Sequence, residues 1–226
     1  MAHKYNIGII FDCDGTLVDS IQGWRGLEHE LARLAGESLS ESDIELLCTF
    51  TIAETANFYH TKFGIGKSDK DVIKLMYDFL LNFYSTKVEL RPGAKDFVQC
   101  VVDAGIPCAV ASSSPQRYLK ACFEHVGLQD TFDVVLSTDD LQTSKREPKL
   151  YDYAANVLGT TRSNTWGFED SIYAVHTLKN AGFYCVGVYD RDDSGTYDDL
   201  SKNADIAIKG FDEISPDVLL GKLINI

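Results

Sequence analysis

Short, continuous apolar segments recur along this chain and alternate with segments of helical period, and this alternation constrains the fold more than any other feature. The apolar segments span residues 7–11, 107–111, 133–137, 165–168 and 184–188. The segments of helical period, each followed by a glycine, span residues 93–104, 116–126, 150–158 and 172–181. Strands without polar alternation are typical of a parallel sheet covered by helices, and glycine commonly ends a helix. The sequence therefore predicts an α/β fold with a doubly wound parallel sheet.

The region from residue 20 to residue 87 interrupts this alternation. It holds no convincing strand but has amphipathic helical stretches at residues 24–35, 52–63 and 71–84. We expect an all-helical domain, residues 20–87, inserted into a core formed by residues 1–19 and 88–226. The insertion follows the end of the first strand, where parallel α/β folds bind their ligands, so we expect it to cover the site as a cap.

Composition and charge exclude several classes of protein. The 226 residues carry a formal net charge of −13 and no basic cluster, so we expect neither nucleic acid nor a membrane as a partner. No apolar run approaches the roughly 20 residues of a membrane span, and the apolar start is too short for a signal peptide. We expect a cytoplasmic protein whose cysteines remain reduced thiols, at positions 13, 48, 100, 108, 122 and 185. The acidic segment 190–199 is interpreted as a solvated surface loop.

Two carboxylates, Asp12 and Asp14, directly follow the first predicted strand. Side chains at i and i+2 of an extended segment point to the same side, and burying two such charges requires a cation or a shared proton. Gly15 permits an unusual turn, and Thr16 adds a hydroxyl and a backbone N–H group. Mg²⁺ with a phosphoryl oxygen meets these needs, because Mg²⁺ prefers a few carboxylates completed by water and substrate. An acidic turn at a strand end is the alternative explanation.

The segment Phe-Asp-Cys-Asp-Gly-Thr-Leu-Val-Asp-Ser, residues 11–20, is similar to the first motif of the haloacid dehalogenase-like (HAD) hydrolase superfamily. The family's other motifs resemble segments that follow in the expected order, at residues 109–115, 144–148 and 167–171. The resemblance covers essentially the whole chain and implies a Rossmann-like core. The helical insertion resembles the cap of the branch that contains phosphoglycolate phosphatase and beta-phosphoglucomutase.

The resemblance implies specific roles for the two aspartates of the first motif. Asp12 would be the nucleophile that attacks phosphorus and forms an aspartyl-phosphate. Asp14 would act as general acid toward the leaving oxygen and then as base for the attacking water. Both would also be ligands of Mg²⁺, Asp14 through its backbone carbonyl.

The remaining motifs supply phosphate-binding and metal-binding residues by the same resemblance. Ser112 and Ser113 would bind the phosphoryl group, and Lys145 would neutralise its charge. Asp170 would bind Mg²⁺ directly, with Glu169 as a ligand or acting through a water molecule.

Taken one at a time, these residues have simpler explanations. Ser112 could cap the helix that begins near Pro115, and Lys145 could be a solvated loop lysine. Glu169 and Asp170 could form the acidic first turn of the following helix, favoured by its dipole. Their joint occurrence in the order of the family motifs favours a single phosphoryl-transfer site.

These motifs predict a Mg²⁺-dependent phosphatase whose partner is a small phosphorylated metabolite. The segment 111–115 is similar to the corresponding segment of sugar-phosphate phosphatases in this branch, and this resemblance implies a phosphosugar or a sugar-alcohol phosphate as substrate. The alternatives are a phosphomutase similar to beta-phosphoglucomutase and a non-catalytic binding protein on the same fold. Trp24 and Pro115 stand where the mutase has a histidine and a lysine, which weighs against the mutase. Arg146 and Glu147 depart from the family pattern, in which proline commonly follows the lysine. A monomer is consistent with the sequence, which leaves the oligomeric state open.

Overall fold

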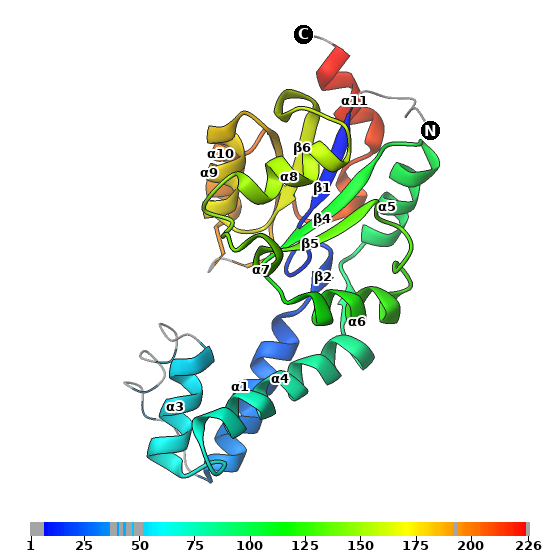
Figure 1. Ribbon diagram of the computed structural model, residues 1–226. Helices are drawn as coiled ribbons and strands as arrows, with labels where there is room; N and C mark the ends of the chain where they lie inside the picture. Colours follow the sequence, from blue (N-terminus) through cyan, green and yellow to red (C-terminus); the bar gives the residue numbers. More distant parts are fainter. Residues whose placement is uncertain are drawn as a thin grey trace. The chain divides into compact units, whose positions relative to one another are not determined.

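The structure, a computed structural model, describes residues 7–36, 40, 43, 47, 52–191 and 194–224. The chain divides into two compact units (Figure 1). The core unit consists of Met1–Ser20 and Val88–Ile226, and the helical unit consists of Ile21–Lys87.

The core unit contains a six-stranded sheet whose neighbouring strands are all parallel. In sheet order the strands are β5 (Val134–Ser137), β4 (Cys108–Ser112), β1 (Gly8–Phe11), β6 (Thr165–Glu169), β7 (Tyr184–Val188) and β8 (Ile206–Ile208). The predicted doubly wound parallel sheet is therefore confirmed. The chain builds outward from β1 on one side and then crosses to the other, so strand order reverses beside β1. Ligands of open α/β sheets bind at such a reversal, outside the carboxyl ends of the strands.

Helices cover both faces of this sheet. They are α5 (Ala94–Asp103), α6 (Gln116–Val126), α7 (Thr138–Leu141), α8 (Lys149–Val157), α9 (Ile172–Ala181), α10 (Tyr197–Asn203) and α11 (Pro216–Ile224), with single 3₁₀ turns at Arg162–Asn164 and Phe211–Glu213. Figure 1 shows α8, α9 and α10 on one face and α5 and α11 on the other. Each face of the sheet is therefore shielded from water.

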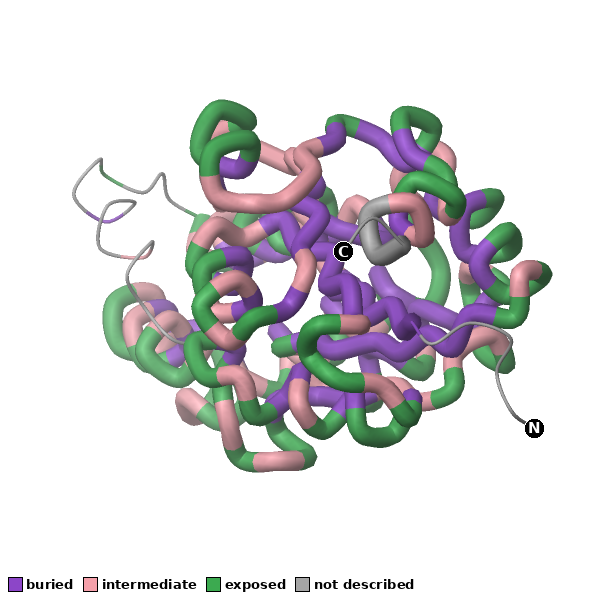
Figure 2. Tube along the Cα trace, turned by 90° about the horizontal axis from the view of Figure 1, so that it is seen from above, coloured by how far each residue is buried: buried purple, intermediate pink, exposed green. Residues whose placement is uncertain are grey.

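Successive residues of the central strands pack on opposite faces, which explains why these strands lack polar alternation. Ile10 belongs to an apolar cluster that includes residues of α8 and α9. The neighbouring Phe11 packs on the other side, with its ring centroid 5.0 Å from that of Phe168 and 6.2 Å from that of Phe97 on α5. Figure 2 shows the resulting buried interior of the sheet and the exposed outer turns of the helices.

The sequence did not predict the shortest strands of the structure. A two-stranded antiparallel ribbon pairs β2 (Val18–Asp19) with β3 (Glu89–Leu90), on either side of the helical unit in the chain. Of the segment 190–199, which was interpreted as a solvated loop, residues 190, 191 and 194–196 do form an irregular loop, but residues 197–199 begin α10 and Asp190 is partly buried. Asp190 forms an ion pair with Arg91, and Thr196 caps α10 through its side chain. The acidic composition of this segment predicted neither the salt bridge of Asp190 nor the start of α10.

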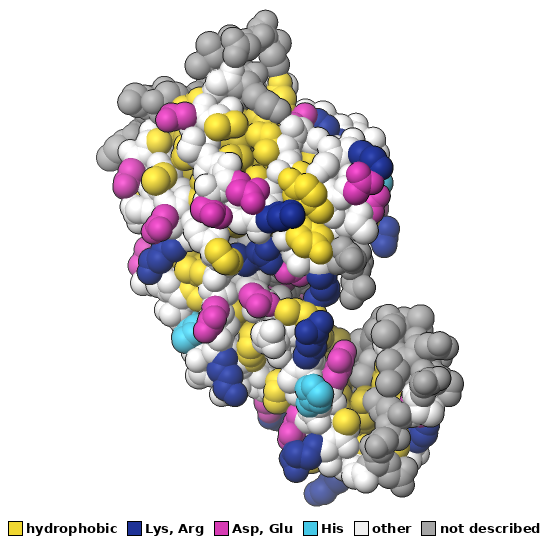
Figure 3. Space-filling model, turned by 180° about the vertical axis from the view of Figure 1, so that it is seen from behind, with side chains coloured by type: hydrophobic (Ala, Val, Ile, Leu, Met, Phe, Trp, Pro, Cys, Tyr) yellow, Lys and Arg dark blue, Asp and Glu magenta, His cyan; other side chains and the backbone are white. Residues whose placement is uncertain are grey.

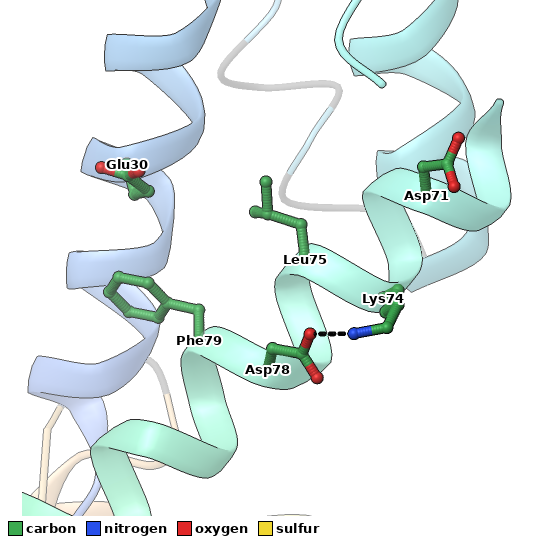
Figure 4. Close-up of a pocket in the computed structure, with 6 residues that line it drawn as sticks. All are labelled: Glu30, Asp71, Lys74, Leu75, Asp78 and Phe79. Atoms are coloured by element: carbon green, nitrogen blue, oxygen red, sulfur yellow. Dashed lines mark hydrogen bonds and ion pairs between the residues drawn. The ribbon is translucent and has the colours of Figure 1, made fainter. Parts of the chain in front are cut away.

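The helical unit contains α1 (Ile21–Ala35), α3 (Ile52–Phe63) and α4 (Asp69–Thr86). Ser68 caps α4 by accepting a hydrogen bond from the backbone N–H of Asp71. Gly23 allows α1 and α4 to approach closely, because a Cβ atom there would lie 2.5 Å from a ring carbon of Phe83. Figure 4 shows a pocket between these two helices, lined by Glu30, Asp71, Lys74, Leu75, Asp78 and Phe79.

On the face shown in Figure 3, basic side chains are interspersed with acidic ones. Cys13, Cys108, Cys122 and Cys185 are buried free thiols, Cys100 is an exposed one, and Cys48 lies outside the described residues. None of the helices in the described part of the chain combines the length and apolar composition that a bilayer crossing requires.

Candidate active site

Asp12 lies where β1 ends, at the edge of the sheet where the strand order reverses. Its backbone N–H donates a hydrogen bond to the carbonyl oxygen of Phe168 at 2.9 Å, which continues the pairing with β6. The following turn bends back through Gly15, whose φ is +82°. A Cβ atom on Gly15 would lie only 2.7 Å from Oδ2 of Asp170. Glycine therefore serves two purposes here, a left-handed backbone conformation and close approach to a carboxylate.

Three carboxylates converge at this edge, from Asp12, Glu169 and Asp170. One oxygen of each lies within 4.8 Å of the others. Their exposed fractions are 5%, 1% and 6%, respectively. The alternative explanation, that Glu169 and Asp170 form the acidic first turn of the following helix, is wrong, because Glu169 ends β6 and α9 begins only after Ser171. Hard oxygen ligands at this spacing suit a small divalent cation.

Lys145 places its ammonium group among these carboxylates. It forms ion pairs with Asp12 and with Glu169, the latter with an Nζ–Oε1 distance of 2.7 Å. The side chain is only 4% exposed, so the alternative of a solvated loop lysine is wrong. Next to Lys145 in the chain, the Arg146 guanidinium lies 4.6 Å from the ring centroid of Tyr173.

Burial shapes the electrostatics of the cluster. It raises the pKa of Glu169 to about 8 and that of Asp170 to about 7, with nearby carboxylates adding to the effect. Burial also raises the pKa of Asp12, although Lys145 opposes the shift. Burial by itself would lower the pKa of Lys145, but Asp12 and Glu169 outweigh it and hold that pKa above its ordinary value. One lysine charge thus faces three carboxyl groups, an imbalance that a divalent cation would correct.

The end of β4 contributes a second group of side chains to the same edge. Ser112 is fully buried, and its Oγ accepts a hydrogen bond from the backbone N–H of Ser114 at 3.0 Å. Ser114 in turn donates from its hydroxyl to Oδ2 of Asp14 at 2.6 Å. The alternative explanation of Ser112 as a helix cap is also wrong, because Pro115 is the capping residue of α6. Ser113, the other predicted phosphate-binding serine, is exposed. Asp14 and Ser112 are thus linked through Ser114.

Sequence reasoning missed two residues that contact the candidate site. Ser114 was read only as part of a motif, and Tyr151 was not singled out at all. The Tyr151 hydroxyl donates a hydrogen bond to Oε1 of Glu169 at 2.6 Å. The helical period over residues 150–158 predicts a buried face that includes Tyr151, but it carries no signal for the partner of a buried hydroxyl.

This chain is similar to known proteins in sequence and in fold. The family model described as haloacid dehalogenase-like hydrolase matches residues 9–188. The phosphoglycolate phosphatase of Rhodobacter capsulatus is 28% identical over 179 residues, covering 77% of this chain and 80% of that protein. Hexitol phosphatase B of Escherichia coli (strain K12) is 26% identical over 178 residues, which cover 77% of this chain and 80% of that protein. The crystal structure of beta-phosphoglucomutase from Clostridium difficile superposes with a TM-score of 0.72 at 19% identity, covering 98% of both chains, which shows a common fold.

Proposed function

The chain belongs to the haloacid dehalogenase-like hydrolase family, and we propose that it is a Mg²⁺-dependent phosphatase that hydrolyses a small phosphorylated metabolite. The substrate class we propose is a phosphosugar or a sugar-alcohol phosphate. We further propose that the inserted helices, residues 20–87, act as a cap that selects this substrate. This role of the insertion is supported by its place in the chain, after the first strand of the core.

One observation carries the proposal: Asp12, Lys145, Glu169 and Asp170 form a single buried cluster at the edge of a parallel sheet. A cluster that served stability alone would be unfavourable, because buried charges are stabilising only when they are balanced and hydrogen-bonded. Concentrating acids around one lysine suits a site that binds a cation and a phosphoryl group.

The donor set of the cluster fits Mg²⁺. Asp12, Glu169 and Asp170 offer carboxylate oxygens, the ligand type that this ion prefers, and Oε2 of Glu169 is buried with no hydrogen-bond donor among the described residues. We propose these three side chains and the backbone carbonyl of Asp14 as the residues that hold the metal. Bound there, Mg²⁺ would stabilise negative charge on the transferring phosphoryl oxygens.

In the first proposed step, a carboxylate oxygen of Asp12 attacks phosphorus. The bond from phosphorus to the ester oxygen breaks, and that oxygen leaves with its electron pair and takes a proton from Asp14. Lys145 offsets the charge on the phosphoryl oxygens, while Ser112 and Ser113 donate hydrogen bonds to them. The products are the free alcohol and an aspartyl-phosphate on Asp12.

In the second proposed step, water gives a proton to the Asp14 carboxylate and attacks phosphorus. The acyl phosphate bond breaks, inorganic phosphate leaves, and Asp12 is regenerated as a carboxylate. Ser114 supports this assignment, because its hydroxyl bonds to Asp14 at 2.6 Å and so ties the acid–base group to the end of β4.

Hydrolysis rather than mutase chemistry is favoured by Pro115. It stands where the mutase has a lysine, and proline has neither a charged side chain nor a backbone N–H group. The names of two relatives, phosphoglycolate phosphatase and hexitol phosphatase B, support a small phosphorylated metabolite as substrate.

Phosphorus NMR on a panel of hexose, pentose and sugar-alcohol monophosphates tests this function, with Mg²⁺ and with a chelator. We expect one new resonance, from inorganic phosphate, and only when Mg²⁺ is present. A positional isomer of the substrate with little free phosphate would instead establish the mutase. Asp170→Ala serves as the metal control, since it should weaken both Mg²⁺ dependence and turnover.

A further inference from the structure

Tyr151 brings a buried hydroxyl to the metal-binding side of the candidate site. The residue belongs to α8 and is 1% exposed. Its ring packs in the apolar core, with the ring centroid 6.2 Å from that of Phe183. Its hydroxyl donates to Oε1 of Glu169 at 2.6 Å. A phenol held on all sides by the core has one orientation, so this hydrogen bond has a fixed direction.

The two oxygens of Glu169 have different surroundings. Oε1 receives hydrogen bonds from both Tyr151 and Lys145, at 2.6 and 2.7 Å. Oε2 is buried and receives none from any residue that the structure describes. A buried carboxylate oxygen without a donor is unfavourable unless another ligand satisfies it. Oε2 is therefore the oxygen that remains available to a cation or to a water molecule bound to one.

Lys145 alone does not account for this asymmetry. Its ammonium group also pairs with Asp12, and its flexible stem allows it to follow either carboxylate. Tyr151 has no such freedom, because its ring is enclosed in the core. Of the two donors to Oε1 of Glu169, Tyr151 therefore has the more restricted position.

We propose that Tyr151 is a positioning residue that holds Oε1 of Glu169 and thereby reserves Oε2 for the divalent cation. The proposal rests on the function proposed above and adds a residue from α8 to the metal site. Removing the hydroxyl leaves the carboxylate free to turn both oxygens toward Lys145. The affinity for the cation then falls, while the catalytic groups stay in place. Loss of a group that orients a metal ligand weakens binding by about 10- to 100-fold.

Tyr151→Phe tests this role, since it deletes one oxygen and keeps the ring in the core. Mg²⁺ binding is measured by titration calorimetry without substrate, and Mn²⁺ binding by electron paramagnetic resonance. We expect the dissociation constant for either ion to rise about 10-fold. Tyr153→Phe is the matched control, because it deletes a hydroxyl from an exposed position of the same helix. The control should bind Mg²⁺ as the wild type does.

Kinetics separate positioning from a general structural defect. In Tyr151→Phe, the Mg²⁺ concentration for half-maximal activity should rise about 10-fold, while kcat at saturating Mg²⁺ stays within about 2-fold of the wild type. In a Glu169→Gln background, adding Tyr151→Phe should change Mg²⁺ affinity little, because the tyrosine acts through Glu169.

Two results would overturn the proposal: a folded Tyr151→Phe variant with wild-type Mg²⁺ affinity, or a loss of kcat that excess Mg²⁺ does not restore. Thermal unfolding monitored by circular dichroism establishes that the variant is folded. Failure of the proposed function is distinguishable, because the wild type itself would then neither bind Mg²⁺ nor release phosphate.

Discussion

The acid cluster of the core unit and Asp43 of the helical unit have opposite electrostatic character. In the core unit, burial raises the pKa of Glu169 to about 8 and that of Asp170 to about 7. In the helical unit, hydrogen bonds from Lys62 and Ser40 lower the pKa of Asp43 to about 2. The helical unit therefore has a satisfied carboxylate, whereas the core unit has carboxylates that lack enough positive charge.

The difference separates groups that hold a fold together from groups arranged for chemistry. A carboxylate with its own lysine contributes to stability, while crowded carboxylates around one lysine oppose it. Proteins retain such unfavourable clusters at functional sites, where a ligand supplies the missing charge. We therefore expect substitutions in the acid cluster to change activity, and substitutions in the helical unit to change stability.

Asp12→Asn should produce the largest effect. The amide keeps the shape of the side chain but removes the nucleophile, so turnover should fall by roughly 10³-fold or more. The melting temperature should change little, because the substitution also removes one of the crowded negative charges. Phosphate release and differential scanning calorimetry measure the two quantities on one preparation. Near wild-type turnover in a pure, folded sample would refute the role of Asp12.

Lys145→Met should lower both turnover and stability, because Lys145 belongs to the proposed active site and also balances buried carboxylates. Removing the positive charge of Lys145 leaves Asp12 and Glu169 without their ion-pair partner, which should lower the free energy of unfolding by about 3–5 kcal/mol without metal. Mg²⁺ should restore part of this loss, since it supplies positive charge at the same place. Urea unfolding with and without Mg²⁺ measures the effect. An unchanged stability would mean that Lys145 does not balance the cluster.

Gly23→Ala should lower stability of the helical unit, because the new methyl group would overlap the ring of Phe83 at 2.5 Å. Overpacking of this kind costs about 1–3 kcal/mol. Gly26→Ala is the matched control on the same helix, where the nearest atom of Phe79 would lie at 3.3 Å. Its better helix propensity should offset the tighter contact. The stabilities of the two variants are compared by urea unfolding, followed through the fluorescence of Trp24 in the helical unit. Equal stabilities would contradict the close packing of α1 on α4.

The dependence of stability on pH should have opposite signs in the two units. Folded Glu169 and Asp170 keep protons that the unfolded chain loses near pH 4, so metal-free stability of the core should fall as pH rises from about 4 to about 8. Asp43 has a lowered pKa, so its contribution is present above about pH 4 and is lost as pH falls toward 2.

The two tryptophans allow the units to be followed separately. Trp166 is buried in the core unit and Trp24 lies in the helical unit, so Trp24→Phe and Trp166→Phe each leave one reporter. Melting curves of these variants at several pH values, with a chelator or with Mg²⁺, test the prediction. Mg²⁺ should abolish the loss of core stability that occurs as pH rises. A core whose metal-free stability rose between pH 5 and pH 8 would contradict the direction of the shifts.

Much of the fold could be predicted because continuous apolar strands and amphipathic helices carry strong local signals. Residues 116–126, 172–181 and 184–188 were predicted with the bounds that the structure gives to α6, α9 and β7. The missed β8 is short, Ile206–Ile208, and only partly buried, so it resembles a loop in sequence. The two-residue strands β2 and β3 are recognisable only as a pair, and the pairing joins distant parts of the chain.

By itself, the sequence determined the type of fold and the group of residues gathered at one edge of the sheet. Strand periodicity predicts the sheet, and the resemblance of four segments to the family motifs groups Asp12, Lys145 and Asp170 at the edge where the carboxyl ends of parallel strands meet. Only the tertiary structure decided which partner each side chain has. Tyr151 reaches Glu169 because α8 packs across the sheet, and Arg91 pairs with Asp190 across 99 positions. Such partners depend on strand order and helix packing, which local periodicity does not encode.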